Sequence, residues 1–557
     1  MKRLFAMLLA VCMIFSLVAC GGSDTTPNTN EPAKENANTA TNTDPSTPAE
    51  SGGTTEAAPQ NEVGSAAPGA IATVSTKDTF TFAMLGEPIS LDNSATADAA
   101  TPTGWLYFSQ LYDTLLLFDA NEQEFYPRLA NSWEYNDDAT EITFELRTDG
   151  LFHCGAPVTA EDVVWSLNRT AASDFVSAMS GAIDHFEVVD DNHVKMVLKY
   201  AYAPALQVLT VPCWGIVCPT HAQEAEANGT DFGRNPCGSG AYKLVSWETG
   251  RQLSFDAAEG HWEGAPAIQH VNAVIVGDAA AGALALEQGT IDYHPSVATT
   301  DFEYLSTLDS VHTELLPGTA IITIYMNTQE GPFADVRVRQ AVSMAVDRAE
   351  ILMGGKDGYG SIANCYCSPV CTGYDAAFTA TPQDLEKAKE LLAEAGYPNG
   401  FSVECKQDSS PTYMPVAEVV QAQLRKIGIE LEFNKMERTT WTDVVSVQKD
   451  YYITVRQSMF SVYDADYMLT RQFYSTSASN FTNYNNPDMD VLLDAARVET
   501  DPVKRNEMYT EAFTMIRDEA PVVPLLYNAS LQAISADLMG MMDDFSWRDM
   551  WNRLYFI

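Results

Sequence analysis

Basic residues are scarce in this sequence. Its 557 residues include 32 lysines and arginines against 75 aspartates and glutamates, so the formal net charge is -43. Nucleic acids and anionic lipid headgroups are bound mainly through clusters of lysine and arginine, and no such cluster is present. We therefore expect no nucleic-acid partner and interpret the excess acid as a solubilising surface.

The common motifs of secreted enzymes are also missing. The sequence has no His-Glu-x-x-His zinc pair, no Gly-x-Ser-x-Gly nucleophile elbow and no Gly-x-x-x-x-Gly-Lys-Ser/Thr phosphate loop. The nearest match surrounds Ser239, but Cys237 replaces the first glycine and a strand follows, which favours a tight turn. The sequence thus predicts no catalytic residue, and an extracellular hydrolase with an unrecognised site is kept as an alternative.

Cysteine pairs with the spacing of a metal site are absent as well. None of the ten cysteines forms Cys-x-x-Cys, and the group at residues 365–371 lacks the second half of a zinc-binding set. We predict no metal site and no cofactor. Eight cysteines after Cys20 favour disulfides in an exported protein, within a neighbourhood of Cys213, Cys218 and Cys237 and another at residues 365–371. Buried free thiols are the alternative.

Only one apolar run lies near the start of the sequence. Lys2 and Arg3 precede residues 4–18, and this run is short for a membrane-spanning helix of about twenty residues. A basic start, a short apolar centre and small residues at the end are typical of a secretory signal. The following Leu-Val-Ala-Cys-Gly-Gly segment resembles the bacterial lipobox. We therefore expect a lipoprotein signal peptide at residues 1–20, a lipid attached to Cys20 and an extracytoplasmic protein anchored to the cell membrane.

Residues 21–76 contain almost no large apolar side chains and are rich in Thr, Asn, Pro, Ala, Ser, Gly and Glu. Such a segment cannot bury enough apolar surface to offset the entropy of folding. We expect a disordered tether, which at this length spans on the order of 40 Å.

After residue 76 the pattern is that of a folded α/β body. Residues 79–85, 141–147, 193–199 and 270–276 read as strands. Residues 381–396 read as a helix with Thr381 as its cap, Pro382 in its first turn and Gly396 at its end. Strands and helices then alternate over residues 401–457, which predicts βαβ units and a mixed or parallel sheet.

Four segments in this body resemble the family 5 extracytoplasmic solute-binding proteins of ABC transporters, which bind dipeptides, oligopeptides or nickel. They are residues 126–169, 236–262, 324–351 and 486–527, and together they place the resemblance over the whole folded body. One departure is Cys154, which stands where the family usually has Asp in a His-Asp-Gly turn. We expect an altered turn there.

The resemblance implies a class II periplasmic-binding-protein-like clamshell of α/β class. Lobe I would comprise residues 77–318, with an inserted subdomain at about 115–235, and would be completed by residues 529–557. Lobe II would comprise residues 319–528. Two apolar crossing strands, near residues 321–326 and 522–527, would join the lobes at a hinge.

The resemblance also implies a transport role. A monomeric protein would bind peptides or another small solute between its lobes, close around the ligand and deliver it to a membrane permease with separate ATPase subunits. A metal chelate or an opine is the alternative solute, and a sensor or adhesin is an alternative of another class.

The candidate ligand-binding residues come from two sources. In the family an Asp of lobe II commonly binds the ligand's α-amino group, and the matching stretch here contains Asp464 and Asp466, although one alignment puts Ser461 at the Asp position. Arg456 could bind a carboxylate through its planar fork. The remaining candidates are an asparagine beside the hinge and aromatic residues, namely Asn327, Trp105, Trp214, Tyr325 and Tyr463.

Overall fold

A computed structural model describes residues 71, 73–541 and 550–557 of the chain. The predicted signal peptide, Cys20 and most of the predicted tether lie outside these residues. Among the described residues, no helix combines the length and the apolar character needed to cross a membrane.

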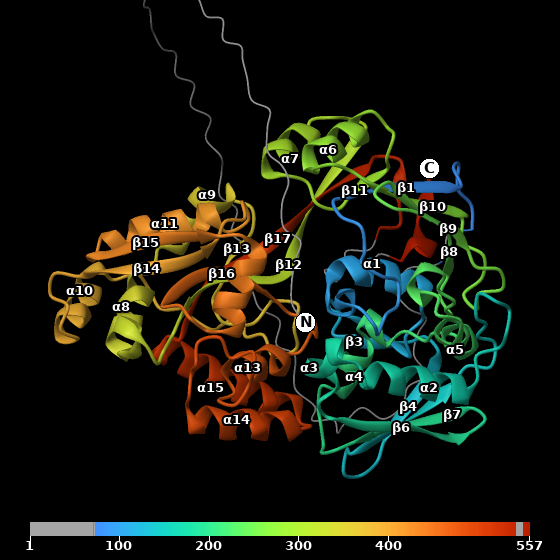
Figure 1. Cartoon of the computed structure of the whole chain (residues 1–557), viewed down its shortest axis with the longest axis horizontal. Helices are drawn as coiled ribbons and strands as arrows, with labels where there is room; N and C mark the ends of the chain where they lie inside the picture. The colour runs from blue at the N-terminus through green and yellow to red at the C-terminus, as the bar shows by residue number, and fades with distance from the viewer. Residues whose placement is uncertain (1–70, 72, 542–549) are drawn as a thin grey trace, which may run out of the picture. The chain divides into compact units, whose positions relative to one another are not determined.

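A large mixed sheet runs through the body (Figure 1). In spatial order its strands are β15 (Ile429–Met436), β14 (Phe401–Asp408), β16 (Ile453–Met459), β12 (Val311–Met326), β17 (Val522–Ser535), β11 (Tyr293–His294), β1 (Thr79–Met84), β10 (His270–Ile275), β9 (Gln252–Ala257) and β8 (Tyr242–Glu248), with β13 (Ser361–Ile362) paired to β17. We call the part built on β1 and β8 to β11 the first lobe, and the part built on β14, β15 and β16 the second lobe.

The long strands β12 and β17 belong to both lobes. Their antiparallel pairing runs from Val311 opposite Ser535 to Tyr325 opposite Val522, with a register shift after Pro317. At this shift a Cβ on Gly318 would lie 2.2 Å from the backbone oxygen of Asn528, so only glycine allows the two strands to approach so closely. The predicted crossing segments therefore lie in paired strands with an irregularity between the lobes.

The first lobe adds a four-stranded antiparallel sheet and a hairpin to its part of the large sheet. The predicted strands at residues 79–85, 141–147, 193–199 and 270–276 are confirmed as β1, β5, β7 and β10. The added strands are β4 (Ala130–Tyr135), β5 (Glu141–Leu146), β7 (His193–Leu198) and β6 (Ile183–Asp190), with the hairpin β2 (Leu116–Asp119) and β3 (Glu124–Pro127) and the pair β18 (Leu538–Met539) and β19 (Tyr555–Phe556). The helices are α1 (Pro102–Leu111), α2 (Ala160–Ala171), α3 (Ser177–Ser180), α4 (Ala205–Leu209), α5 (Pro219–Asn228), α6 (Ala279–Glu287) and α7 (Thr299–Leu305), with short 3-10 turns that include η3 (Pro212–Trp214).

The second lobe has the predicted βαβ character, because β14 and β15 are parallel and α11 connects them. Ile322 and Ile324 of β12 pack with α8 and α11 on one face of the sheet. The helices are α8 (Val336–Ala345), α9 (Arg348–Lys356), α10 (Leu385–Glu394), α11 (Met414–Arg425), α12 (Arg438–Trp441) with the π-helical turn η6 (Thr442–Val447), α13 (Ala465–Phe473), α14 (Pro487–Val498) and α15 (Pro502–Glu519).

Two local predictions need correction. The helix expected from Thr381 begins at Leu385, because Asp384 accepts the Lys387 N–H as its cap, while Gly396 ends the segment at φ +94° as expected. The eight described cysteines are free thiols, seven of them buried, so the predicted disulfides are not formed in this structure.

Asp113 anchors the centre of the first lobe. Its fully buried carboxylate pairs with the Arg128 guanidinium and accepts hydrogen bonds from Trp262 Nε1 at 2.8 Å and His261 Nε2 at 3.0 Å. Burial favours the neutral acid, but the Arg128 charge and the His261 and Trp262 contacts outweigh it and hold the pKa of Asp113 well below its usual range. The Asp113 N–H in turn donates to Ser239 Oγ, so Ser239 serves the packing of this lobe.

We predict that Asp113→Asn lowers the free energy of unfolding by about 3–5 kcal/mol at neutral pH, because it leaves Arg128 buried without a counter-charge. A carboxylate with a lowered pKa contributes stability above its unfolded pKa of about 3.9, and this contribution is lost as the pH falls toward the folded value. The melting temperature of the wild type should therefore decrease when the pH is lowered below about 4. The melting temperature of Asp113→Asn should be lower at neutral pH and should decrease less on acidification.

Asp149→Asn is the matched control, because Asp149 pairs with Arg147 but its side chain is 62% exposed. Thermal unfolding of both variants across pH checks the prediction. Equal melting temperatures for the two variants at neutral pH would contradict it.

Candidate functional site

The stretch predicted to bind ligand runs from β16 into α13 and is tied to both the hinge and a neighbouring loop. Phe460 N–H donates to the Thr319 carbonyl at 2.9 Å, beside the register shift of β12. Farther along, the Tyr463 carbonyl accepts from Thr372 N–H at 3.0 Å. Residues 460–464, which we call the cleft segment after the cleft that the family resemblance implies, are therefore attached to β12 at its register shift and to the loop at Thr372.

The face of β12 and β16 opposite the α8 and α11 helices carries polar side chains. Tyr325 Oη lies 2.6 Å from Ser458 Oγ and also contacts the Tyr366 hydroxyl. Burial raises the pKa of Tyr325, which keeps its phenol neutral as a hydrogen-bonding group, and the nearby Arg456 opposes the shift only in part. This face thus presents hydroxyls next to the cleft segment.

Arg456 is half-buried on this polar face within a group of aromatic rings. Its guanidinium carbon lies 4.3 Å from the ring centroid of Phe481, 5.3 Å from that of Trp441 and 5.5 Å from that of Tyr325. Its polar contact is one long hydrogen bond from Nη1 to Ser446 Oγ at 3.4 Å, and its Nε is buried without a partner. In the described part of the chain no ion pair to a carboxylate forms at Arg456.

Asp464 is fully buried and is held by the second lobe itself. Its Oδ1 accepts from Tyr509 Oη at 2.9 Å and from the Asp466 N–H at 2.9 Å, which caps α13. Its Oδ2 lies 3.2 Å from Arg505 Nη2. The carboxylate is therefore neutralised and bonded within the protein.

Asp466 joins the two lobes. Its Oδ2 accepts from the hydroxyl of Tyr202 in the first lobe at 3.3 Å, and its Oδ1 lies 3.4 Å from Arg497 Nε. The Arg497 carbonyl also accepts from the Ala203 N–H of the first lobe at 3.0 Å. Burial raises the pKa of Asp466, which Arg497 lowers and Asp464 raises further.

A second contact between the lobes adjoins the other end of the cleft segment. Gln123, in the turn between β2 and β3, donates from Nε2 to the Val370 carbonyl at 3.1 Å and accepts from Thr372 Oγ1 at 2.7 Å. Thr372 is the residue that bonds Tyr463. Neither Gln123 nor Tyr202 carried a signal in the sequence, because each is a single polar residue whose partner lies 249 or 264 positions away.

The other predicted residues fall into two groups. Ser461 and Tyr463 lie in the cleft segment, 6% and 2% exposed. Asn327, Trp105 and Trp214 are at most 2% exposed. The Asn327 side chain donates to the Lys449 carbonyl and accepts from Gln329 N–H. Trp105 Nε1 donates to the Ala99 carbonyl. The Trp214 ring packs on Phe186, while its Nε1 has no hydrogen-bond partner. The structure thus brings Arg456 and Tyr325 together, keeps Ser461, Tyr463 and the two aspartates close in the chain between β16 and the start of α13, and puts both tryptophans in the packed first lobe.

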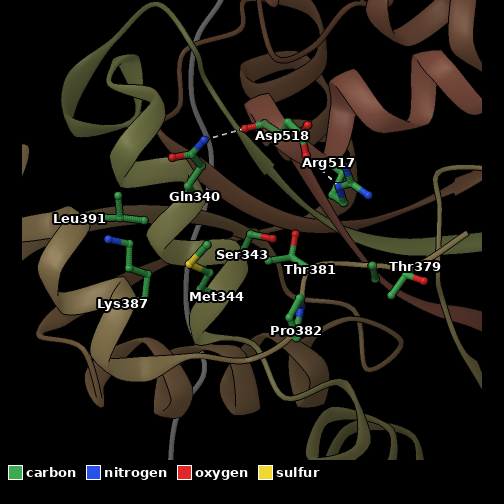
Figure 2. Close-up of a pocket in the computed structure, with 11 residues that line it drawn as sticks. Gln340, Ser343, Met344, Thr379, Thr381, Pro382, Lys387, Leu391, Arg517 and Asp518 are labelled. Atoms are coloured by element: carbon green, nitrogen blue, oxygen red, sulfur yellow. Dashed lines mark hydrogen bonds and ion pairs between the residues drawn. The ribbon is translucent and has the colours of Figure 1, made fainter.

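A separate hollow of about 560 Å³ lies on the second lobe (Figure 2). Met344 and Leu391 form its apolar wall, and Gln340 donates across it to the Asp518 carbonyl at 2.8 Å. None of the predicted ligand-binding residues lines it, and only the second lobe contributes to it. This hollow is therefore separate from the cleft segment.

Comparison with known proteins relates the chain to binding proteins. The chain is 29% identical over 464 residues to heme-binding protein A of Haemophilus influenzae, across 77% of this chain and 84% of that protein. It is 26% identical over 469 residues to the dipeptide-binding protein of Escherichia coli, and this match covers 78% of this chain and 86% of that protein. The fold matches a solved structure, that of the ABC transporter-associated periplasmic binding protein DppA from Helicobacter pylori in complex with peptide STSA. The TM-score is 0.74 and the sequence identity 25%, and the match covers 86% of this chain and 98% of that chain.

These matches confirm the predicted α/β fold of a two-lobed periplasmic binding protein. Residues 124–480 match the sequence model of the bacterial extracellular solute-binding proteins, family 5, middle part. Its members are solute-binding proteins of transporters. The chain belongs to the family 5 bacterial extracellular solute-binding proteins.

Proposed function

We propose that this protein captures peptides between its lobes and delivers them to the permease of an ABC importer. The observation that carries the proposal is Arg456, a half-buried cation on the polar face of β12 and β16 that pairs with no carboxylate among the described residues. The names of two relatives, one a dipeptide-binding protein and one solved with a peptide, support peptides as the solute class.

Arg456 would bind the terminal carboxylate of the peptide. Its guanidinium presents a planar set of donors that matches a carboxylate, and the aromatic rings around it would exclude water and strengthen the pair. The chain is rich in acidic residues, so a half-buried arginine without an acidic partner in residues 73–541 and 550–557 is best explained by a ligand that supplies one. Tyr325, Ser461 and Tyr463 would line the same site.

A free amino terminus is not required in this proposal. Asp464 is bonded to Arg505 and Tyr509, and Asp466 is bonded to Arg497 and Tyr202, so both carboxylates have partners within the protein. Ligand recognition through the carboxylate would leave these contacts in place. The aspartates would then stabilise the position of the lobes and make no direct contact with the ligand.

The two contacts between the lobes would form on closure. A ligand that holds the lobes together favours the state in which Gln123 meets Thr372 and Tyr202 meets Asp466. The closed protein, a monomer in this proposal, would then be docked by the permease, whose separate ATPases supply the energy.

The domain bounds stated from the sequence are part of the same proposal. The second lobe would begin near residue 319, and the chain would return to the first lobe near residue 529.

The alternative solute is a metal chelate or an opine. A heme-binding relative favours this alternative within the same transport role. Titration with peptides and with a metal chelate or an opine distinguishes the two solute classes, because the peptide proposal predicts tight binding of peptides and the alternative predicts tight binding of the nonpeptide solute.

We predict that Arg456→Gln reduces the affinity for peptides with a free terminal carboxylate by at least about 2 kcal/mol, roughly 30-fold, because the charged pair is lost. Isothermal titration with di- to pentapeptides and their terminal amides measures this effect. The wild type should discriminate strongly against the amides, and the variant should bind acid and amide alike.

Arg425→Gln is the matched control, since Arg425 lies on the surface of the same lobe and pairs with Glu430. It should keep the discrimination of the wild type. If the wild type binds acids and amides equally, Arg456 is not the carboxylate site, and if it binds none of the peptides, the peptide proposal fails.

Gln123→Ala should weaken ligand binding by about 1 kcal/mol, roughly fivefold, because two hydrogen bonds of the closed state are removed. Its melting temperature without ligand should stay near that of the wild type. Gln448→Ala serves as control, because exposed Gln448 bonds only Asp443 of its own lobe. Titration of both variants with the same peptide checks the effect, and indistinguishable affinities would refute a role for Gln123 in closure.

We also propose that Cys20 carries the lipid that anchors the protein at the extracytoplasmic face of the membrane. Cys20→Ala should leave the body folded and able to bind ligand but release it into the soluble fraction. Fractionation of the producing cells followed by detection of the protein measures this. Retention of the variant in the membrane would rule out the lipid anchor.

A further inference from the structure

Four side chains that can bind a metal converge in the first lobe, away from the cleft segment. They are Cys154, Cys218, His221 and Cys237, and their ligand atoms all lie within 4.8 Å of one another. Cys218 Sγ lies 3.3 Å from His221 Nδ1. From this convergence we propose that the first lobe binds one Zn²⁺ ion through three cysteines and one histidine.

The donor set fits zinc. Three sulfurs and one imidazole nitrogen form a closed tetrahedral site of the structural type, which needs no further ligand. With Zn–S of about 2.3 Å and Zn–N of about 2.0–2.1 Å, the ligand atoms of such a site lie about 3.5–3.8 Å apart. Cys218 Sγ and His221 Nδ1, 3.3 Å apart, are slightly closer than this, and pairs at the 4.8 Å limit would need to approach by about an ångström.

Local structure brings Cys218 and His221 together. Cys218 is the N-cap of α5, and His221 is the third residue of this helix. The N-cap and third positions are the pair whose side chains meet at the start of a helix, as in a capping box. The positive end of the helix dipole also favours thiolate ligands at this point.

Backbone hydrogen bonds position the other two cysteines. The Cys237 carbonyl accepts from Cys218 N–H at 2.9 Å, and Val217 forms a bridge with Gly238. Gly238 also accepts from His153 N–H at 2.8 Å, which holds the turn of Cys154 against the same segment. Three chain segments that are distant in sequence are thus aligned before any metal binds.

Burial supports a structural ion with an entry path. Cys218 and Cys237 are 2% and 4% exposed, His221 is half-buried and Cys154 is exposed. An ion could therefore enter from the side of Cys154, with the thiols releasing their protons to solvent as they bind. The ion would join the turn at residues 152–156, the start of α5 and the loop that leads into β8. All four ligands belong to the first lobe, so the ion is a structural component of that lobe and is separate from the solute that is transported.

The test uses the full chain without a polyhistidine tag, purified with a phosphine reductant. Wild-type protein should retain one Zn²⁺ per chain by elemental analysis after dialysis, and added Co²⁺ should produce intense thiolate-to-cobalt charge-transfer bands. Cys218→Ser and His221→Gln should weaken zinc affinity by more than about 100-fold, since changes to outer contacts of metal sites alone cost about 10- to 100-fold.

Cys154→Ser keeps the proposal testable if changes to the buried ligands prevent folding, because Cys154 is exposed. It should fold, bind Zn²⁺ more weakly and lose the rise in melting temperature that zinc gives the wild type. Cys405→Ala is the matched control: it removes a fully buried thiol of the second lobe and should leave zinc binding unchanged.

Two results would overturn the proposal. One is zinc content in the wild type no higher than in Cys218→Ser. The other is a Cys218–Cys237 disulfide in metal-free protein isolated from its host without reductant. Neither result bears on the transport proposal, because no step of the zinc test involves the solute or the second lobe.

Discussion

The pairing of β12 with β17 is the constraint on which the other features depend. These strands run through both lobes, and the close approach of Gly318 to Asn528 marks the point where their register changes. The cleft segment begins where Phe460 bonds Thr319, one residue beyond that point. A small rotation at the register shift would therefore move the whole cleft segment relative to the first lobe.

The two aspartates at or just beyond the end of this segment both have partners within the protein. Asp464 caps a helix and pairs with Arg505, whereas Asp466 accepts a hydrogen bond from the opposite lobe. Charges placed in this way stabilise one arrangement of the lobes. Arg456 differs from them because its neighbours are rings and a hydroxyl, which leaves its charge available to a bound anion.

Much of the fold could be predicted from sequence because its signals are local. Alternating apolar residues identified β1, β5, β7 and β10, and the order of strands and helices after residue 401 identified the βαβ units. The start of α10 was misplaced because Thr381 and Asp384 are both good caps, and the choice between them depends on packing outside the helix. The predicted domain bounds rest on resemblance, the ligand contacts rest on resemblance and on side-chain chemistry, and both stay predictions.

Long-range juxtapositions could not be predicted in the same way. The Cys-x-x-Cys pattern does not mark the group around Cys218, because its histidine follows three residues later and its other cysteines come from two other segments of the chain. The unusual Cys154 was the one local signal. Gln123 and Tyr202 had no signal at all, since their roles depend on partners that only the folded chain brings near.

Peptide capture is the central claim, and native mass spectrometry of the protein purified from its own host tests it most directly. The proposal predicts a series of co-purified masses that correspond to peptides of different length and composition, released when the protein is denatured. A single nonpeptide mass bound in place of such a series would contradict it.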